Sequence, residues 1–119
     1  MIRKTHVIID CPDTTSLARF YADLLGGEIG DTDSEWITVT TPTVRLGFQR
    51  VEDYRAPEWP GQQIPQQLHL DFEVDDFQAE GDRAVGLGAR HLEDHLGDDG
   101  TGFVVYLDPA GHPFCLVSG

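Results

Sequence analysis

The sequence predicts an α+β fold in which eight strands form two βαβββ modules, with one helix outside each sheet. An internal repeat is the first reason. The first 29 residues return 63 positions later in the same chemical order, so that His6 aligns with His69 and Leu24 with Leu87. The second reason is that each copy reads as a strand, an acidic helix start, a helix and a glycine-marked stop. Two similar halves are therefore expected.

The first copy begins with a strand over residues 5–11, which contains a β-branched run. Asp13 is a suitable N-cap for a helix over about residues 14–25. Apolar residues recur in this helix at the spacing of one face: Leu17, Phe20, Tyr21, Leu24 and Leu25. Gly26 and Gly27 end it. Three strands are expected to follow, at residues 28–30, 36–41 and 44–51.

The second copy begins after a Pro-rich loop, 52–66, whose length suggests a functional segment. It predicts a strand at 68–74, a helix from about 76 to 87, a strand at 89–93, a loop at 95–102, a strand at 103–107, a turn at 108–111 and a strand at 113–118. Gly81 and Gly86 weaken this helix by roughly 1 kcal/mol each relative to alanine. We expect one domain, 1–119, built of repeats at about 4–51 and 67–118.

The composition narrows the class of partner. Eight basic against 21 acidic side chains give a net charge of −13, which repels nucleic acids and anionic membrane surfaces. Apolar runs are too short to span a bilayer, and the start lacks a signal-peptide pattern. The two cysteines, Cys11 and Cys115, lie far apart without a disulfide framework. We therefore expect free thiols in a cytoplasmic protein that contacts neither nucleic acid nor membrane.

Strand alternation assigns the candidate site residues to faces. In the second copy His69, Asp71 and Glu73 point one way, and the apolar residues between them point toward the helix. The repeat places His6 in the same way in the first copy. Two histidines that approach a shared concavity suggest a metal site.

Other side chains are candidates for ligand contact. Trp36, Phe48, Trp59 and Tyr106 are aromatic residues suited to the wall of a ligand pocket. Phe48 fits a core position equally well, and Trp59 would also serve to anchor its loop. Asp71 and Glu73 are candidates for a base or for an orienting group, or for pairing with arginine.

Four segments carry a resemblance to a known family. They are Thr5-His6-Val7, the helix segment Ala18-Arg19-Phe20-Tyr21-Ala22-Asp23-Leu24-Leu25-Gly26-Gly27, the strand segment 69–76 and the ending Asp108-Pro109-Ala110-Gly111-His112-Pro113-Phe114-Cys115-Leu116. With the repeated βαβββ plan, they resemble the vicinal-oxygen-chelate superfamily. This superfamily includes glyoxalase I, extradiol dioxygenases, and fosfomycin- and bleomycin-resistance proteins. The resemblance covers essentially the whole chain.

The resemblance implies that each half curls into a cup and that the cups form a cleft, the glyoxalase/bleomycin-resistance/dioxygenase fold. Metal-dependent members hold the ion with histidines on the first and fifth strands, which match His6 and His69. Cys115 occupies the last-strand position where such enzymes usually have glutamate, and the fourth-strand position falls near Leu46. A His6, His69 and Cys115 set suits zinc better than an octahedral metal.

Two function classes follow from the resemblance. The first is a protein without a complete metal site that binds a small organic molecule through His6, Phe48, Trp59, His69, Tyr106 and Cys115. The second is a lyase, isomerase or dioxygenase in which His6, His69 and Cys115 hold a divalent metal, zinc or iron. The loss of both carboxylates favours the first class and argues against glyoxalase I activity. The resemblance also implies a homodimer.

Overall fold

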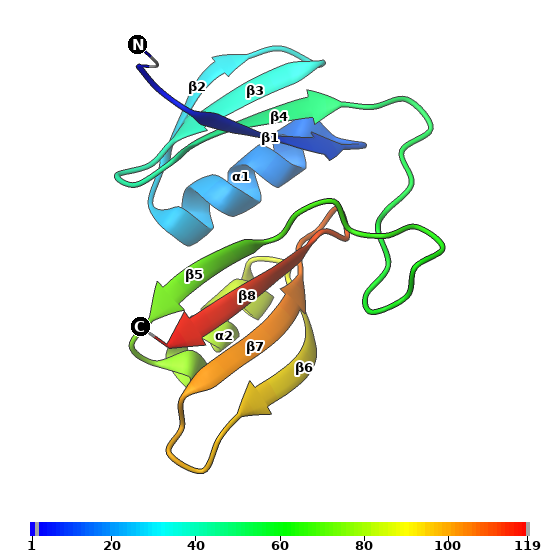
Figure 1. The fold of residues 1–119 in the computed structure, drawn as a ribbon. Coiled ribbons are helices and arrows are strands. Elements are labelled where there is room, and N and C mark those ends of the chain that lie inside the picture. Colours follow the sequence, from blue (N-terminus) through cyan, green and yellow to red (C-terminus); the bar gives the residue numbers. More distant parts are fainter. Residues whose placement is uncertain (2, 119) are drawn as a thin grey trace. The chain divides into compact units, whose positions relative to one another are not determined.

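The computed structural model describes residues 1 and 3–118, and their side chains except that of Asp31. The chain divides into two compact units, Met1–Tyr54 and Arg55–Gly119. Each unit contains a four-stranded sheet and one helix (Figure 1).

The first unit consists of β1 (His6–Cys11), α1 (Thr14–Leu25), β2 (Glu28–Thr32), β3 (Trp36–Thr40) and β4 (Arg45–Arg50). Its strands lie in the order β1-β4-β3-β2. β1 runs parallel to β4, and the other neighbours are antiparallel. The helix covers one face of this sheet (Figure 1).

The second unit repeats this plan with β5 (Leu70–Val74), α2 (Phe77–Gly86), β6 (Arg90–Leu96), β7 (Gly102–Leu107) and β8 (Pro113–Ser118). The strand order is β5-β8-β7-β6, and β5 runs parallel to β8. The predicted fold class of two βαβββ modules, each with mixed strand directions, is confirmed.

The helix α1 begins and ends where the sequence predicts. The side chain of Asp13 accepts hydrogen bonds from the backbone N–H groups of Thr15 and Ser16 at 3.0 and 3.3 Å, which satisfies two of the free N–H groups of the first turn. Gly26 closes the helix in the left-handed conformation at φ 68°, which glycine adopts without steric cost. The buried ring of Tyr21 stacks on Phe48 at 5.6 Å and joins the helix to the sheet.

The helix α2 is shorter and buries less. Only Gly81 and Ala84 are buried in it, whereas seven residues of α1 are buried. Gly81 has a packing reason, because a Cβ at this position would overlap the hydroxyl of Tyr106. The Tyr106 ring in turn stacks on Phe114 at 5.6 Å. The glycine that weakens the helix therefore lets it approach the sheet.

Three boundaries differ from the expectation by two residues or more, and β2 is the first, because it runs to Thr32 and not only to residue 30. β6 extends to Leu96 and not only to residue 93, because β7 pairs with it as far as the Leu96–Gly102 pair. β5 begins at Leu70, two residues later than expected. Among the described residues, no helix has the length and apolar character needed to cross a membrane.

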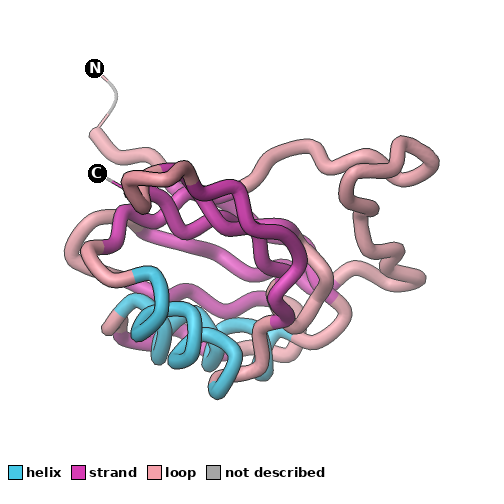
Figure 2. The backbone as a smooth tube through the Cα atoms, turned by 90° about the horizontal axis from the view of Figure 1, so that it is seen from below, coloured by secondary structure: helices cyan, strands magenta, loops and turns pink. Residues whose placement is uncertain are grey.

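The predicted loop between the repeats is a long connection with little regular structure (Figure 2). Its only β-pairing among the described residues is an isolated bridge between Glu58 and Pro65. The backbone N–H of Glu58 also donates to the carbonyl of Ile64 at 2.6 Å. This short contact folds the segment back on itself around Trp59.

The two glycines of α2 provide a matched test of its packing. We predict that Gly81→Ala lowers the free energy of unfolding by about 1–3 kcal/mol, because the new methyl overlaps the Tyr106 hydroxyl. Gly86→Ala meets no atom within 4 Å and should be neutral or stabilise by up to about 1 kcal/mol. Urea unfolding measures both. Tyr106→Phe should restore stability to Gly81→Ala, and a Gly81→Ala protein as stable as the wild type would contradict this packing.

Candidate functional site

The second sheet has one face that α2 does not cover. The strand register places Asp71 beside Cys115, Cys115 opposite Val105, and Val105 opposite Glu93. The side chains of paired residues on neighbouring strands point to the same side of a sheet. These four side chains therefore share one face. We call it the helix-free face. Residues 70, 72 and 74 alternate with them and are more buried, as the sequence predicts.

A cluster of three potential ligand groups lies on the helix-free face. The Nε2 atom of His69 is 3.3 Å from Oδ1 of Asp71. One ligand atom from each of His69, Asp71 and Cys115 lies within 4.8 Å of the other two. The thiol is 4% exposed, whereas the imidazole and the carboxylate are exposed. The cluster thus joins a buried sulfur to two groups that solvent or a ligand can reach.

The thiol of Cys115 is held in its protonated form. Burial, the negative charge of Asp71 and a hydrogen bond to that carboxylate raise the pKa of Cys115 to about 11. The S–H group donates to the carboxylate, so deprotonation would leave two negative charges side by side. At neutral pH the cluster therefore offers a thiol and a carboxylate, not a thiolate.

Trp59 lies beside this cluster. Its ring stands edge-on to His69, with the two ring centroids 6.5 Å apart. The indole Nε1 is buried and has no hydrogen-bond partner of good geometry, yet it is close enough to Glu93 to lower the pKa of that carboxylate. The larger cause of that lowering is the hydrogen bond that His95 Nε2 donates to Glu93 at 2.9 Å. Trp59 thus adds an aromatic edge to the polar cluster.

The first unit carries His6 on the corresponding face of its own sheet. His6, Ile8 and Asp10 are exposed, while Ile9 and Cys11 alternate with them and are buried. The repeat therefore preserves the face of the histidine. His6 belongs to a different compact unit from His69 and Cys115, so the three-residue set predicted from the resemblance remains a prediction.

The fourth-strand position near Leu46, where the resemblance implies a metal ligand, can be located within the first unit. Leu46 is 0% exposed and shares the buried face with Phe48. The positions of β4 registered with the exposed residues of β1 are Arg45, Gly47 and Gln49. None of them supplies a carboxylate, which agrees with the missing fourth-strand ligand.

Two aromatic residues predicted to line the ligand site lie elsewhere. Phe48 is 0% exposed and stacks on Tyr21, so it occupies the core position that the sequence left open. Tyr106 directly follows Val105 in β7 and therefore points away from the helix-free face, toward α2. Of the predicted ligand-contacting residues, the structure brings Trp59, His69 and Cys115 together.

Asp71 is the residue that the predicted ligand sets omit. Its alternation with His69 was visible in the sequence and suggested a base or an orienting group. Its closeness to Cys115 depends on the parallel register of β5 and β8, which places these two residues side by side. No sequence signal gives that register.

Comparisons with known proteins agree with this architecture. The family model of the glyoxalase-like domain matches residues 6–117. No curated protein matches the chain. Among solved structures, a fosfomycin resistance protein from Mesorhizobium loti is 16% identical with a TM-score of 0.73, and covers 100% of this chain and 94% of its own. A bleomycin-binding protein from Streptomyces verticillus is 18% identical with a TM-score of 0.64, and covers 100% and 98%.

A third solved structure, an oxidase, is 25% identical with a TM-score of 0.70 and covers 100% of this chain and 94% of its own. The fold is thus that of the glyoxalase, bleomycin-resistance and dioxygenase proteins. The chain belongs to the glyoxalase-like domain family. This fold occurs both in binding proteins and in enzymes. The resemblance to this family that the sequence suggested is confirmed.

The charge of Asp71 should control the reactivity of Cys115. We predict that Asp71→Asn lowers the pKa of the thiol, because it removes the negative charge that disfavours the thiolate. At a fixed pH near 8, iodoacetamide should then alkylate Cys115 several-fold faster, as measured by mass spectrometry of its peptide. Glu73→Gln, two residues along the same strand, is the matched control and should leave the rate unchanged. An unchanged or slower rate in Asp71→Asn would show that the carboxylate does not act on the thiol.

Proposed function

We propose that this protein binds a small organic molecule on the helix-free face of the second sheet, and that it does so without a resident metal. The observation that carries the proposal is the cluster of His69, Asp71 and Cys115 beside Trp59. Small-molecule sites combine apolar and aromatic walls with a few fixed polar groups. This face supplies both within one unit of the chain.

Each residue has a distinct part in such a site. The exposed imidazole of His69 and carboxylate of Asp71 offer a donor and acceptors to a polar group of the ligand. The partly exposed Trp59 ring offers contact to an aromatic or aliphatic body. The protonated Cys115 completes the floor as a small buried group, which favours a neutral compound over a metal ion.

The names of the structural neighbours support a small-molecule ligand. One is a fosfomycin resistance protein and another was solved with copper(II)-bleomycin bound. Fosfomycin and bleomycin are both organic compounds. At 16% and 18% identity, these two proteins share only their fold with this chain. The ligand class is therefore our proposal.

A metal-dependent lyase, isomerase or dioxygenase is the second candidate, and one observation favours it. The nitrogen, oxygen and sulfur atoms of the cluster form a donor set that suits zinc, which accepts three protein ligands and a water molecule. A bound metal would polarise a substrate oxygen. His69 and Asp71 would hold it, Cys115 would join after losing its proton, and iron fits this sulfur-containing set less well.

We also infer how the protein is organised in the cell. One domain made of the repeats at about 4–51 and 67–118, assembled as a homodimer in the cytoplasm, is consistent with the family and with two free cysteines. Twofold pairing is the commonest closed symmetry. Sedimentation at tens of micromolar, a rough range for an interface of standard area, should show a dimer.

Ligand binding on the helix-free face can be tested by thermal shift against a library of small aromatic natural products. A compound that binds the native state raises Tm by mass action. We predict that His69→Ala removes most of the shift and lowers the melting temperature of the free protein little, because its side chain is exposed. Asp98→Asn, in the exposed turn between β6 and β7, is the control that should retain the shift. Compounds whose shifts survive His69→Ala, Asp71→Asn and Trp59→Ala together would place the ligand elsewhere.

Metal content separates the two candidates. We predict that protein purified without a histidine tag or chelator contains far less than one metal ion per chain by elemental analysis, because a metal must displace the proton of a thiol whose pKa is raised to about 11. Stoichiometric zinc or iron that is lost in both His69→Ala and Cys115→Ser would overturn the metal-free proposal. It would instead establish the metal-dependent candidate.

A further inference from the structure

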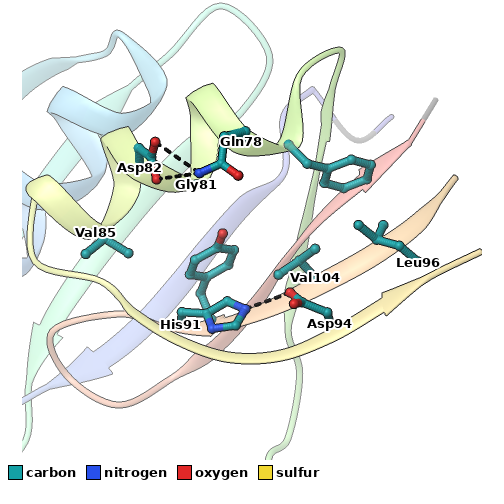
Figure 3. A pocket seen from close by; sticks show the side chains of 10 residues that line it. Gln78, Gly81, Asp82, Val85, His91, Asp94, Leu96 and Val104 are labelled. Carbon is teal, nitrogen blue, oxygen red and sulfur yellow. Dashed lines mark hydrogen bonds and ion pairs between the residues drawn. The ribbon is translucent and has the colours of Figure 1, made fainter. Parts of the chain in front are cut away.

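A cavity lies on the opposite side of the same sheet from the cluster, between α2 and the edge strand β6 (Figure 3). Its volume is about 340 Å³. Gln78, Asp82 and Val85 line it from the helix, and His91 and Asp94 line it from β6. We call it the helix-edge cavity. It shares no lining residue with the cluster on the helix-free face, so it is independent of the proposed function.

The internal repeat shows how the contact between helix and sheet differs in the second module. At a spacing of 63 residues, the bulky Phe20 and Tyr21 of α1 correspond to Arg83 and Ala84 of α2. Phe20 and Tyr21 are buried, whereas Arg83 turns outward to pair with Glu80 at 3.0 Å. The second module thus keeps the backbone plan but replaces large buried side chains of the helix.

The cavity carries negative charge. Asp82 and Asp94 line it, and neither lysine nor arginine is among its lining residues. His91 Nε2 donates to one oxygen of Asp94 at 2.7 Å, and Gln78 Nε2 donates to both oxygens of Asp82 at 3.0 and 3.1 Å. A carboxylate accepts about four hydrogen bonds, so both groups can accept more. The two carboxylates thus remain able to bind a further donor.

Tyr106 provides an independent indication of a polar occupant. The residue is 5% exposed, lines the cavity and has its hydroxyl against Gly81. No hydrogen bond of this hydroxyl occurs within the described part of the chain, so the hydroxyl is available to pair with a polar atom in the cavity. Burial, and then the charges of Asp94 and Asp82, raise the pKa of Tyr106, which shows that the negative potential reaches the hydroxyl.

The remaining walls are apolar or aromatic. Phe77, Val85, Leu96 and Val104 line the cavity together with the ring of Tyr106. Val85 and Leu96 are 48% and 43% exposed, which is high for large apolar residues. Aromatic rings and carboxylates together favour an organic cation, because a ring face attracts positive charge and a carboxylate pairs with it.

The first unit contains an equivalent groove with a different charge. Thr15, Arg19 and Ile37 line a cavity between α1 and its sheet, and Arg19 stands where the repeat places Asp82. Among the side chains that the structure describes, Asp33 is the only acidic one in that lining, and Arg19 offsets its charge. The architecture therefore creates a groove in each module, and among the described side chains only the groove of the second module is lined by a net negative charge.

We propose that the helix-edge cavity binds a small organic cation, a primary amine on a short aromatic or aliphatic body. The ammonium group pairs with the carboxylate of Asp94 on β6, Asp82 adds negative charge from the helix side, and the Tyr106 hydroxyl pairs with a polar atom of the same ligand. The apolar body contacts Phe77 and Val85. A volume of about 340 Å³ lies at the lower end of the range for small-molecule sites, which limits the ligand to a compact molecule.

The first experiment compares three probes of the same shape on the wild-type protein: phenethylamine, phenethyl alcohol and phenylacetate. Methyl-resolved NMR titration gives both the affinity and the place of binding. We expect the amine to shift the methyl signals of Val85, Leu96 and Val104 and to bind about fivefold or more tightly than the alcohol, with the acid weakest. Equal affinity for amine and alcohol, or unshifted signals at these three residues, would overturn the proposal.

The second experiment tests the carboxylates. Asp94→Asn and Asp82→Asn should each weaken phenethylamine binding about fivefold and leave the alcohol unchanged. The control is Asp98→Asn in the exposed turn between β6 and β7, which changes the net charge equally and should have no effect. Amine binding in both cavity variants equal to that of Asp98→Asn would refute the site. If one cavity variant does not fold, the other one decides the result.

Discussion

The structure depends on one constraint, which is that a single short helix can cover only one face of a four-stranded sheet. In each unit the apolar alternate residues of the strands pack toward the helix, as Ile9 and Phe48 do in the first unit. The polar alternate residues must then lie on the other face. This constraint places His6 in one unit and His69 in the other on helix-free faces, before any particular chemistry is considered.

The two modules show how far a repeated backbone can diverge in its side chains. α1 fills its contact with the sheet by aromatic stacking, whereas α2 uses Gly81 and Ala84 to approach β7 and β8 closely. The same divergence gives the second module a protonated thiol beside a carboxylate on one face and an anionic cavity on the other. Both proposed binding sites therefore lie in the second module.

The element order, the N-caps and the faces of β1 and β5 were predictable, because each follows from local spacing. Asp13 caps α1 as expected, Asp76 is the equivalent cap of α2 in the repeat, and Asp71 alternates with the apolar residues of its strand. The face of Tyr106 was not predictable. Residues 103–107 of β7 are apolar on both faces of the sheet, so the sequence pattern does not show which residues point to which face. Only the pairing of Val105 with Cys115 assigns Val105 to the helix-free face and Tyr106 to the opposite face.

The closeness of Asp71 and Cys115 was likewise hidden, because two parallel strands separated by about forty residues carry no local signal of their register. Our central proposal is that a small-molecule ligand contacts the helix-free face. Methyl-resolved NMR with the compound that most raises Tm tests it most directly, since Val105 and Val117 lie on that face and Leu116 on the other. The account predicts shifts at Val105 and Val117 with Leu116 unmoved, and the reverse pattern would contradict it.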